Sequence, residues 1–398
     1  MAEDLPFRNF VFQLLVGAGV VMGVIGLFNR LVDPFWYYRD VSIEGINATK
    51  PLFLGFERHV KPAILARVRP EAITVGSSLS EVGFDPLNPS FTDRGRLNGY
   101  NFAVAGGQWR MTQCYFEYAL AHAPVKRAVV EMRPPMNLVD SKCVGPEAGL
   151  DIATLGDLLF SIRALRASVQ TILKQGEDTW SYTPEGQFFY ARHAPGVESR
   201  FRDQLSQVFR EKHCERSVLR DGPGFMPQAP KGGPVAKLDL SGLRKVVEAA
   251  QRKGVELRLT VHPKHAYVYE LDARCGESAD TWDALRQIAL VVHEASGGDE
   301  RIQFWAFIGY NEVTAEPVRE GMKFWQDPLH LNHEVGDMMF EAMFGQLGST
   351  SPVIGYRVTP DNVDAFRRRF EARRRSFIEA NPWFDRGLRA LLPLSAGD

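Results

Sequence analysis

The stretch AITVGSS, residues 72–78, decides the fold class of this chain of 398 residues. Four residues suited to a buried strand lead directly into a glycine and two small hydroxyl residues, as in a strand that ends in a sharp turn. Similar short runs follow along the chain, at residues 100–104, 128–132, 255–261 and 302–307. Segments with the apolar periodicity of amphipathic helices lie between them, for example from Leu240 to Ala250 and from Trp282 to Val292. Alternating strands and helices predict an α/β fold, with a parallel sheet covered by helices on both faces.

The overall composition is that of a globular protein. Hydrophobic residues make up 45% of the chain, and 47 Lys and Arg are balanced by 48 Asp and Glu. This balance excludes a disordered polyelectrolyte and a general nucleic-acid-binding protein. The four cysteines, at positions 114, 143, 214 and 275, form no Cys-x-x-Cys pair and no zinc-finger spacing. They give no cysteine metal site and leave one or two disulfides possible.

The N-terminal region predicts a membrane anchor. Residues 10–28 form a run of nineteen residues without a charge, which is long enough to cross a bilayer. No small-residue cleavage site closes the run, so we expect an uncleaved helix rather than a signal peptide; a buried core helix is the alternative. The aromatic segment at 34–38 suits the headgroup layer. Flanking charges hardly set the orientation, but long domains behind a first apolar segment are commonly translocated. We therefore predict a single-pass protein of the inner (cytoplasmic) membrane whose domain faces the periplasm or the outside.

The rest of the chain divides into a large domain and a tail. We expect the anchor and its aromatic segment at residues 1–39, an α/β domain at 40–350, and a basic helical tail at 351–398. A largely helical insertion, at about 138–237, interrupts the α/β pattern and could cap the core. The tail holds six arginines among residues 367–375, which indicates a solvated basic helix or, alternatively, contact with anionic lipid or an acidic polymer.

Chemistry is expected where parallel strands end, because loops and helix N-termini converge there. Ser78 follows the first strand, and Gly106 and Gly107 follow the second. Each of these loops alone is also an ordinary tight turn. The stretch FWQDPLHLNHEVGD, residues 324–337, adds Asp327 and His330 near the end of the core.

The order Ser…Asp-x-x-His resembles that of the SGNH (GDSL-like) hydrolase superfamily. The resemblance implies a flavodoxin-like α/β/α three-layer sandwich in which Ser78 is the nucleophile and Asp327 and His330 complete the catalytic group. Gly106 and Gly107 look like the second block of the family and would supply backbone oxyanion donors. The third block, Gly-x-Asn-Asp, is replaced by residues 130–137, where Asn137 could supply a further donor.

Within that superfamily, the chain looks most like the membrane-anchored SGNH-like proteins of extracytoplasmic acylation, such as alginate O-acetylation and teichoic-acid D-alanylation. This implies an O-acyltransferase that acts on a surface polysaccharide and needs no cofactor. It would receive acyl groups from a multi-spanning membrane acyltransferase. Gly17, Gly19, Gly23 and Gly26 would allow that partner to pack closely against the anchor. The alternatives are an esterase or deacetylase that uses the same residues, and a catalytically silent scaffold in a polysaccharide assembly complex.

Several other residues are candidates for contact with the substrate. Arg133 could bind an anionic group, His265 lies in a loop after a strand beside His262, and Trp109 could stack on a sugar. Their ordinary alternatives are a salt bridge, a hydrogen bond to loop carbonyls and core packing. Asp327, His330 and His333 could also face one cation, but no other ligand cluster accompanies them, so we predict no metal.

Overall fold

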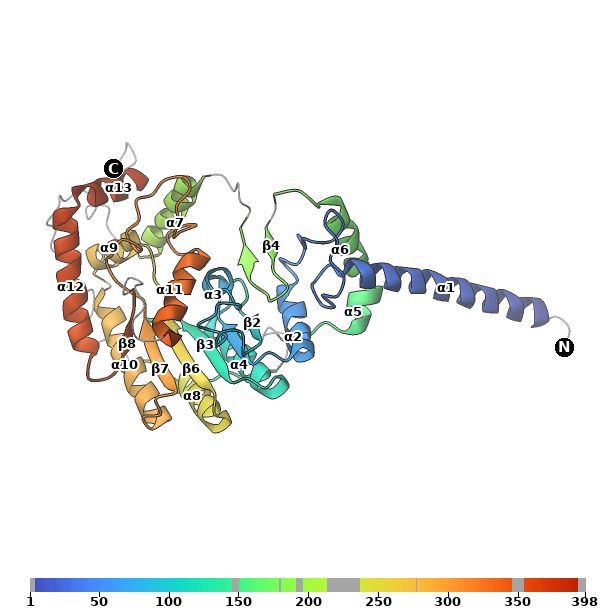
Figure 1. The fold of residues 1–398 in the computed structure, drawn as a ribbon, viewed down its shortest axis with the longest axis horizontal. Helices are drawn as coiled ribbons and strands as arrows, with labels where there is room; N and C mark the ends of the chain where they lie inside the picture. Colours follow the sequence, from blue (N-terminus) through green and yellow to red (C-terminus); the bar gives the residue numbers. More distant parts are fainter. Residues whose placement is uncertain are drawn as a thin grey trace.

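The computed structural model describes residues 4–144, 150–178, 180–190, 196–212, 237–276, 278–345 and 354–392. Its centre is a six-stranded sheet with the strand order β2-β1-β3-β6-β7-β8 (Figure 1). All neighbours pair in parallel except β7 and β8, which are antiparallel. The strands are β1 (Ala72–Val75), β2 (Gly99–Asn101), β3 (Arg127–Met132), β6 (Glu256–Val261), β7 (Ile302–Ala306) and β8 (Tyr356–Val358). The five parallel strands confirm the runs predicted from the sequence, whereas β8 was not predicted.

Helices cover both faces of this sheet. The crossovers after β2, β3 and β6 all advance in one direction along the sheet and carry α4 (Trp109–His122), α8 (Ser241–Lys253) and α10 (Ser278–Ser296), which lie side by side. The crossover after β1 runs the other way and carries α3 (Ser78–Gly83), so the shared handedness of such connections places α3 on the opposite face. There α3 packs against α11 (His333–Phe344).

Two glycines let α3 and α11 approach each other closely. A Cβ atom built on Gly336 would lie only 1.7 Å from the carbonyl oxygen of Gly83. The rings of Phe84 and Phe340 stack beside this crossing with centroids 4.6 Å apart. The loop before α11 is thereby held above the N-terminus of α3.

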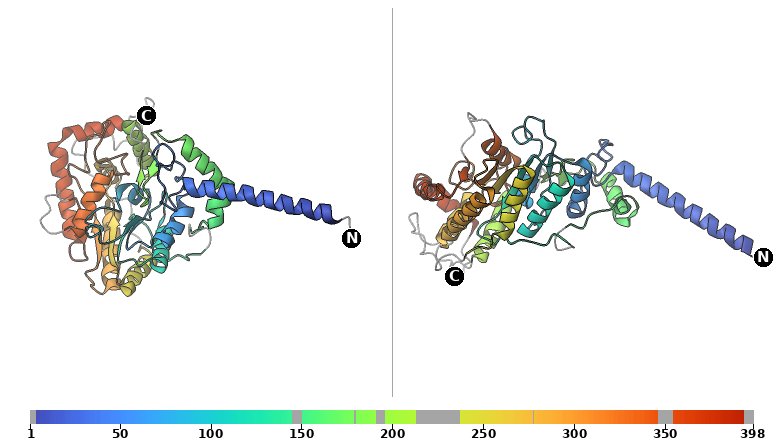
Figure 2. Two further views of the ribbon diagram at one scale, coloured as in Figure 1. Left: turned by 45° about the vertical axis from the view of Figure 1, so that its right-hand side comes forward. Right: turned by 90° about the horizontal axis from the view of Figure 1, so that it is seen from below.

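The N-terminal helix α1 (Asp4–Val32) projects from the domain (Figures 1 and 2). Among the described residues it is the one helix long and apolar enough to cross a membrane, from Phe7 to Val32, and only 6% of its most apolar window is buried. The structure thus agrees with the predicted anchor helix.

The aromatic segment after α1 differs from the prediction. Phe35 and Trp36 are buried in the domain core instead of lying in a headgroup layer, and the Trp36 indole donates to the carbonyl oxygen of Tyr182 (2.9 Å). The reason is Asp33, whose carboxylate accepts hydrogen bonds from the N–H groups of residues 37–39 and turns the chain back onto the domain. The folded unit therefore begins at the end of α1, before residue 40.

The predicted insertion separates into two parts. The first part comprises α5 (Leu155–Phe160) and α6 (Ile162–Leu173), which pack against α1, and the short hairpin β4 (Ser181–Tyr182) and β5 (Phe188–Phe189). The second part is α7 (Val197–Glu211), which packs against α9 (Ala266–Arg274) on the far side of the hairpin (Figure 1). The Gly/Pro-rich stretch expected at 221–234 lies outside the described residues.

The basic tail is part of the folded domain. In α12 (Val363–Ala380), Phe366 and Phe370 pack on Trp282, and Arg374 donates two hydrogen bonds of 2.8 Å to Glu270. The helix α13 (Pro382–Leu391) continues this packing. All three views place α12 on the side of the domain opposite α1 (Figures 1 and 2). Contact of the tail with the lipid around α1 is thus disfavoured.

One disulfide ties α4 to the segment after β3. Cys114 is bonded to Cys143, with the two Cα atoms 5.1 Å apart. Cys275 is also disulfide-bonded, and Cys214 lies outside the described residues.

Candidate active site

Ser78 occupies the first position of α3, directly after the turn that closes β1. Ser77 caps the helix, since its Oγ accepts a hydrogen bond from the N–H of Leu79. The N–H of Ser78 has no intrahelical acceptor, because the first N–H groups of a helix lack one. The Ser78 side chain is therefore presented beside its own N–H, whereas the N–H groups of Leu79 and Ser80 already donate to Ser77 Oγ and to Glu131.

Ser78, His330 and Asp327 form a continuous hydrogen-bonded chain, although 252 residues separate Ser78 from His330. The Ser78 Oγ lies 2.8 Å from His330 Nε2, and His330 Nδ1 lies 2.7 Å from the carboxylate of Asp327. The acceptor carboxylate fixes the tautomer with hydrogen on Nδ1, which leaves Nε2 free to accept the serine proton. The sequence placed these three residues in one site, and the structure brings them together.

The carboxylate of Asp327 is held rigidly. Its second oxygen accepts the backbone N–H groups of Leu329 (2.8 Å) and His330 (2.9 Å), so the Asp-x-x-His spacing forms a closed turn. Burial of this group would raise its pKa, but the hydrogen bonds from His330 and the two N–H groups outweigh it and lower the pKa of Asp327. The carboxylate is ionised at neutral pH and can stabilise a protonated His330.

A buried carboxylate that the sequence analysis missed organises the nucleophile turn. Glu131, on β3, accepts the Ser77 N–H (2.9 Å) and hydroxyl (2.6 Å), and also the Ser80 hydroxyl (2.8 Å). Burial would raise the pKa of Glu131, but the hydrogen bonds from Ser77 and the charge of Arg133 contribute to a net lowering. A Cβ on Gly76 would collide with this carboxylate at 2.5 Å, so the glycine allows the turn to close over it. The sequence signal that could have revealed Glu131 is the presence of a charged residue within the otherwise apolar strand Val129–Met132.

His262 lies beneath the same turn and has an unused acceptor. Its Nε2 is 3.2 Å from Ser80 Oγ, whereas its buried Nδ1 has no hydrogen-bond partner in the described part of the chain. Burial lowers the pKa of His262 despite the nearby carboxylate of Glu131. The imidazole is thus neutral and holds Ser80 in place.

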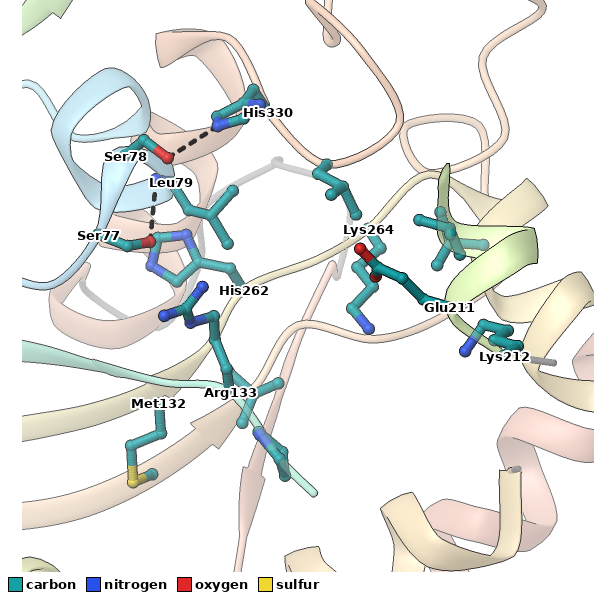
Figure 3. A pocket seen from close by; sticks show the side chains of 15 residues that line it. Ser77, Ser78, Leu79, Met132, Arg133, Glu211, Lys212, His262, Lys264 and His330 are labelled. Carbon is teal, nitrogen blue, oxygen red and sulfur yellow. Dashed lines mark hydrogen bonds between the residues drawn. The ribbon is translucent and has the colours of Figure 1, made fainter. Parts of the chain in front are cut away.

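A pocket of about 460 Å³ opens beside Ser78 and His330. Figure 3 shows Arg133, Lys264 and Glu211 around it, with His262 and Ser77 close to Ser78. Val208 and Glu211 come from the end of α7, so part of the predicted insertion does line the pocket. Such a volume suits a small-molecule group or one sugar unit.

Arg133 lies at this pocket, as the sequence suggested. Its Nη2 donates to the carbonyl oxygen of Gly107 (2.6 Å), its Nε is 3.7 Å from Glu131, and 45% of its side chain is exposed. The guanidinium therefore takes part in a salt bridge and still faces the pocket.

Gly106 and Gly107 lie next to the turn at Gly76, but their positions do not match those expected of oxyanion donors. The N–H of Gly107 donates to the carbonyl oxygen of Val104 (3.1 Å), and neither glycine is among the residues that line the pocket. Gly106 has a φ of +66°, beside the guanidinium of Arg58. This loop needs glycine because it turns tightly against Gly76.

Three further candidates lie away from the pocket. Asn137 is exposed and accepts the N–H of Asp239 (2.8 Å), so its side chain supports the start of α8. His265 is buried, caps α9 and pairs with the carbonyl oxygen of Glu316 (2.8 Å). Trp109 is buried at the start of α4, beside Gly242. His265 and Trp109 thus belong to the core, Asn137 is directed to the start of α8, and none of the three is among the residues that line the pocket.

The alternative in which Asp327, His330 and His333 face one cation gains no support. His333 lies 3.6 Å from Glu334 and against the ring of Phe189. Within the described ranges no group of three His, Cys, Asp or Glu side chains could hold a metal ion.

Comparison with known proteins adds no relative: no family model, no curated protein and no solved structure matches this chain.

Proposed function

We propose that this protein is a membrane-anchored serine acyl-transfer enzyme that acylates a surface polysaccharide outside the cytoplasm. The observation that carries the proposal is the unbroken Ser78–His330–Asp327 chain, with distances of 2.8 and 2.7 Å, at the edge of a pocket. Serine needs a base to act as a nucleophile at neutral pH, and the base needs a third group to orient it.

The strand order supports the SGNH-like interpretation. Taken in chain order, the five parallel strands follow the order 2-1-3-4-5 of flavodoxin-like sheets, to which β8 adds an antiparallel edge. Ligands of such sheets bind outside the carboxyl ends of the strands, near the point where the strand order reverses. Ser78 follows β1 and Arg133 follows β3, the two strands on either side of that point.

The reaction follows from the geometry in two stages. His330 Nε2 takes the proton of Ser78 Oγ as the oxygen bonds to the acyl carbon of the donor ester. The tetrahedral oxyanion is stabilised by the N–H of Ser78, and one such donor is worth about 3 kcal/mol in comparable sites. His330 then gives its proton to the leaving alkoxide, and an acyl-Ser78 ester remains. In the second stage a hydroxyl of the acceptor gives its proton to His330 as its oxygen attacks the acyl carbon. His330 then returns that proton to Ser78 Oγ as the bond between the serine and the acyl group breaks.

Hydrolysis is the rival reaction, because water can take the place of the acceptor hydroxyl. Arg133 and Lys264 at the pocket favour a polymer with anionic groups near the acceptor hydroxyl. A silent scaffold is less well supported, since nothing in a scaffold requires Ser78, His330 and Asp327 to keep hydrogen-bonding distances.

The location rests on two features. The helix α1 is suited to span a membrane, and the Cys114–Cys143 disulfide is typical of a domain outside the reducing cytoplasm. Activated acyl donors are made inside, so a multi-spanning acyltransferase would deliver the acyl group. On α1, Gly19 and Gly23 have no atom within 4 Å of a Cβ position and remain open to such a partner, whereas Gly26 is covered by Phe160.

The test uses the full chain in nanodiscs with a fluorophosphonate probe and a chromogenic acetyl ester. Labelling and ester cleavage should vanish in Ser78→Ala and persist in Ser77→Ala and Ser80→Ala, at a lower rate because Glu131 loses a donor in each. Full labelling of Ser78→Ala would refute the assignment. An added oligosaccharide that gains the acyl group identifies the transferase, and release of free acid alone identifies the esterase.

A further inference from the structure

A surface with exposed apolar side chains surrounds the base of α1. The residues that form it are Leu155 and Phe160 of α5 and Ile162, Val169 and Leu173 of α6. We call this set the α5–α6 surface. Ile162 is 86% exposed and Leu173 is 67% exposed, which is unusual for large apolar residues of a folded domain that faces only water.

The exposed residues of α6 form one stripe. Ile162, Val169 and Leu173 are seven and four residues apart, the spacing of one helix face. The opposite face is buried and consists of small residues, among them Ala164, Ala167, Ser168 and Thr171. The stripe is thus not the face that α6 uses to pack on the protein.

Contacts with α1 fix the depth of this surface. A Cβ on Gly26 would lie 2.5 Å from the ring of Phe160, so Phe160 is level with Gly26. Arg30 marks the polar end of α1, since it pairs with Asp40 (2.9 Å) and lies over the ring of Tyr38. With a rise of 1.5 Å per residue, Gly26 lies about 6 Å further into the bilayer than Arg30. Phe160 therefore reaches below the headgroups when α1 spans the membrane.

A buried hydrogen-bond pair keeps α1 at a fixed position against α5 and α6. The Asn29 amide donates to the carbonyl oxygen of Leu159 (2.8 Å) and accepts the hydroxyl of Ser168 (2.7 Å). Asn29 is only 1% exposed, and polar groups at such a site are costly to leave unpaired. The α5–α6 surface cannot move away from the membrane without breaking this contact.

The charges next to the stripe match a lipid interface. Arg163 and Arg166 are exposed on α6 beside Ile162 and Val169. Basic residues that flank an apolar stripe are the pattern of helices that lie in the plane of a bilayer with anionic lipids.

We propose that the α5–α6 surface is a second membrane contact, inserted at the boundary between headgroups and acyl chains of the leaflet in which α1 ends. The proposal rests on the membrane anchor and is independent of the acyl-transfer chemistry. It gives the domain a fixed orientation on the bilayer, which one helix with a flexible joint would not.

The test measures the depth of single fluorescent labels in the full chain, reconstituted in nanodiscs that contain anionic lipid and phospholipids with a doxyl quencher. Because the cysteines of the described residues are all disulfide-bonded, an introduced thiol is labelled selectively. The label is placed by Ile162→Cys. The control is Leu290→Cys on α10, since Leu290 lies on another face and is 42% exposed in the native chain. A third label, by Gly19→Cys, reports on the anchor, where the side chain has open space. Thermal unfolding shows that each variant is folded, whether or not Ser78 is reactive.

We expect a quencher near the headgroups to reduce the emission at position 162 about twofold, as for interfacial helices, and to leave position 290 unchanged. A quencher at the bilayer centre should act most strongly at position 19. Equal emission at positions 162 and 290, with position 19 quenched, would overturn the second contact and leave the anchor intact. Absence of quenching at position 19 would overturn both the membrane anchor and the second contact. Ester cleavage tests the proposed enzyme function separately. Protection of position 162 only in the presence of another membrane protein would assign the surface to a protein partner and refute the lipid contact.

Discussion

Ser77 donates both its N–H and its hydroxyl to the carboxylate of Glu131, at 2.9 and 2.6 Å. The residue that precedes the candidate nucleophile is thus fixed from below by a charge on the neighbouring strand. Because Ser80 binds the same carboxylate, one turn of helix around Ser78 has a common support.

The first prediction concerns this support. Glu131→Gln replaces one acceptor oxygen by a donor that faces other donors, so the turn should shift while the fold persists. We expect acylation of Ser78 to slow by about 10- to 100-fold and the unfolding free energy to fall by about 1–3 kcal/mol. Probe-labelling rates and thermal unfolding measure the two effects. Glu117→Gln, on α4 away from the pocket, is the control, and equal labelling rates in both variants would contradict a role of Glu131 in positioning.

The second prediction concerns Asp327. In Asp327→Asn the amide keeps one oxygen for the N–H groups of Leu329 and His330 but no longer favours hydrogen on His330 Nδ1. Ester cleavage should drop by about 10³- to 10⁴-fold with little loss of stability, as expected for the wrong tautomer. Single-turnover acylation of the full chain tests this. Asp337→Asn, which alters a carboxylate of α11 that pairs with Asn88, should keep its activity. A rate within a few-fold of the native rate would remove Asp327 from the mechanism.

The third prediction concerns stability at low pH. Burial lowers the pKa of His265 to about 4, so the folded chain holds this imidazole neutral while the unfolded chain protonates it below its ordinary pKa. The stabilisation is complete above about pH 6.5 and is lost as the pH falls toward 4, by about 3 kcal/mol in total. His265→Asn keeps an N-cap acceptor and cannot titrate, so its unfolding free energy should depend less steeply on pH. Identical slopes for the two proteins between pH 4 and 7 would refute this linkage.

The fourth prediction concerns the crossing of α3 and α11. Gly336→Ala introduces a Cβ that overlaps the carbonyl oxygen of Gly83, so the two helices must separate. We expect a loss of about 1–3 kcal/mol in stability and a larger relative loss of activity, because His330 precedes α11. Gly156→Ala of α5, whose Cβ has only an ordinary contact at 3.4 Å, should be neutral. Unfolding curves and ester cleavage of both variants decide the matter.

The fifth prediction concerns topology. A phosphatase reporter that is active only after export, fused after Asp398, should be active in cells, and a fluorescent reporter that needs the cytoplasm should be dark. The mature chain should also keep its first residues. The reverse pattern of reporters would place the domain inside and remove the surface polysaccharide as its acceptor.

The sequence predicted the parallel strands from their local patterns, and the Ser78–Asp327–His330 group from a resemblance in motif order. Buried parallel strands are continuous apolar runs, and the Asp-x-x-His turn closes on itself through the N–H groups of residues 329 and 330. Features that depend on distant contacts were not predictable in this way. Glu131 finds its donors 54 residues earlier in the chain, and Trp36 is buried by Tyr182, 146 residues away.

The misplaced site candidates have the same physical explanation. His265 and Asn137 follow strands, where ligand contacts are common, but their polar atoms satisfy Glu316 and Asp239 instead. A polar residue in a loop has two possible partners, the ligand or the backbone nearby, and the sequence does not distinguish them. The edge strand β8 is only three residues long and has no apolar run of its own to reveal it.

The contact between Gly83 and Gly336 has a consequence for how such chains diverge. A single methyl group at position 336 would move His330 away from Ser78 while Ser78, Asp327 and His330 all keep their places in the sequence. A descendant with that change would retain all three residues and is expected to be less active than its ancestor. Comparing these three residues alone would miss the loss, and the identity of one glycine in a helix would reveal it.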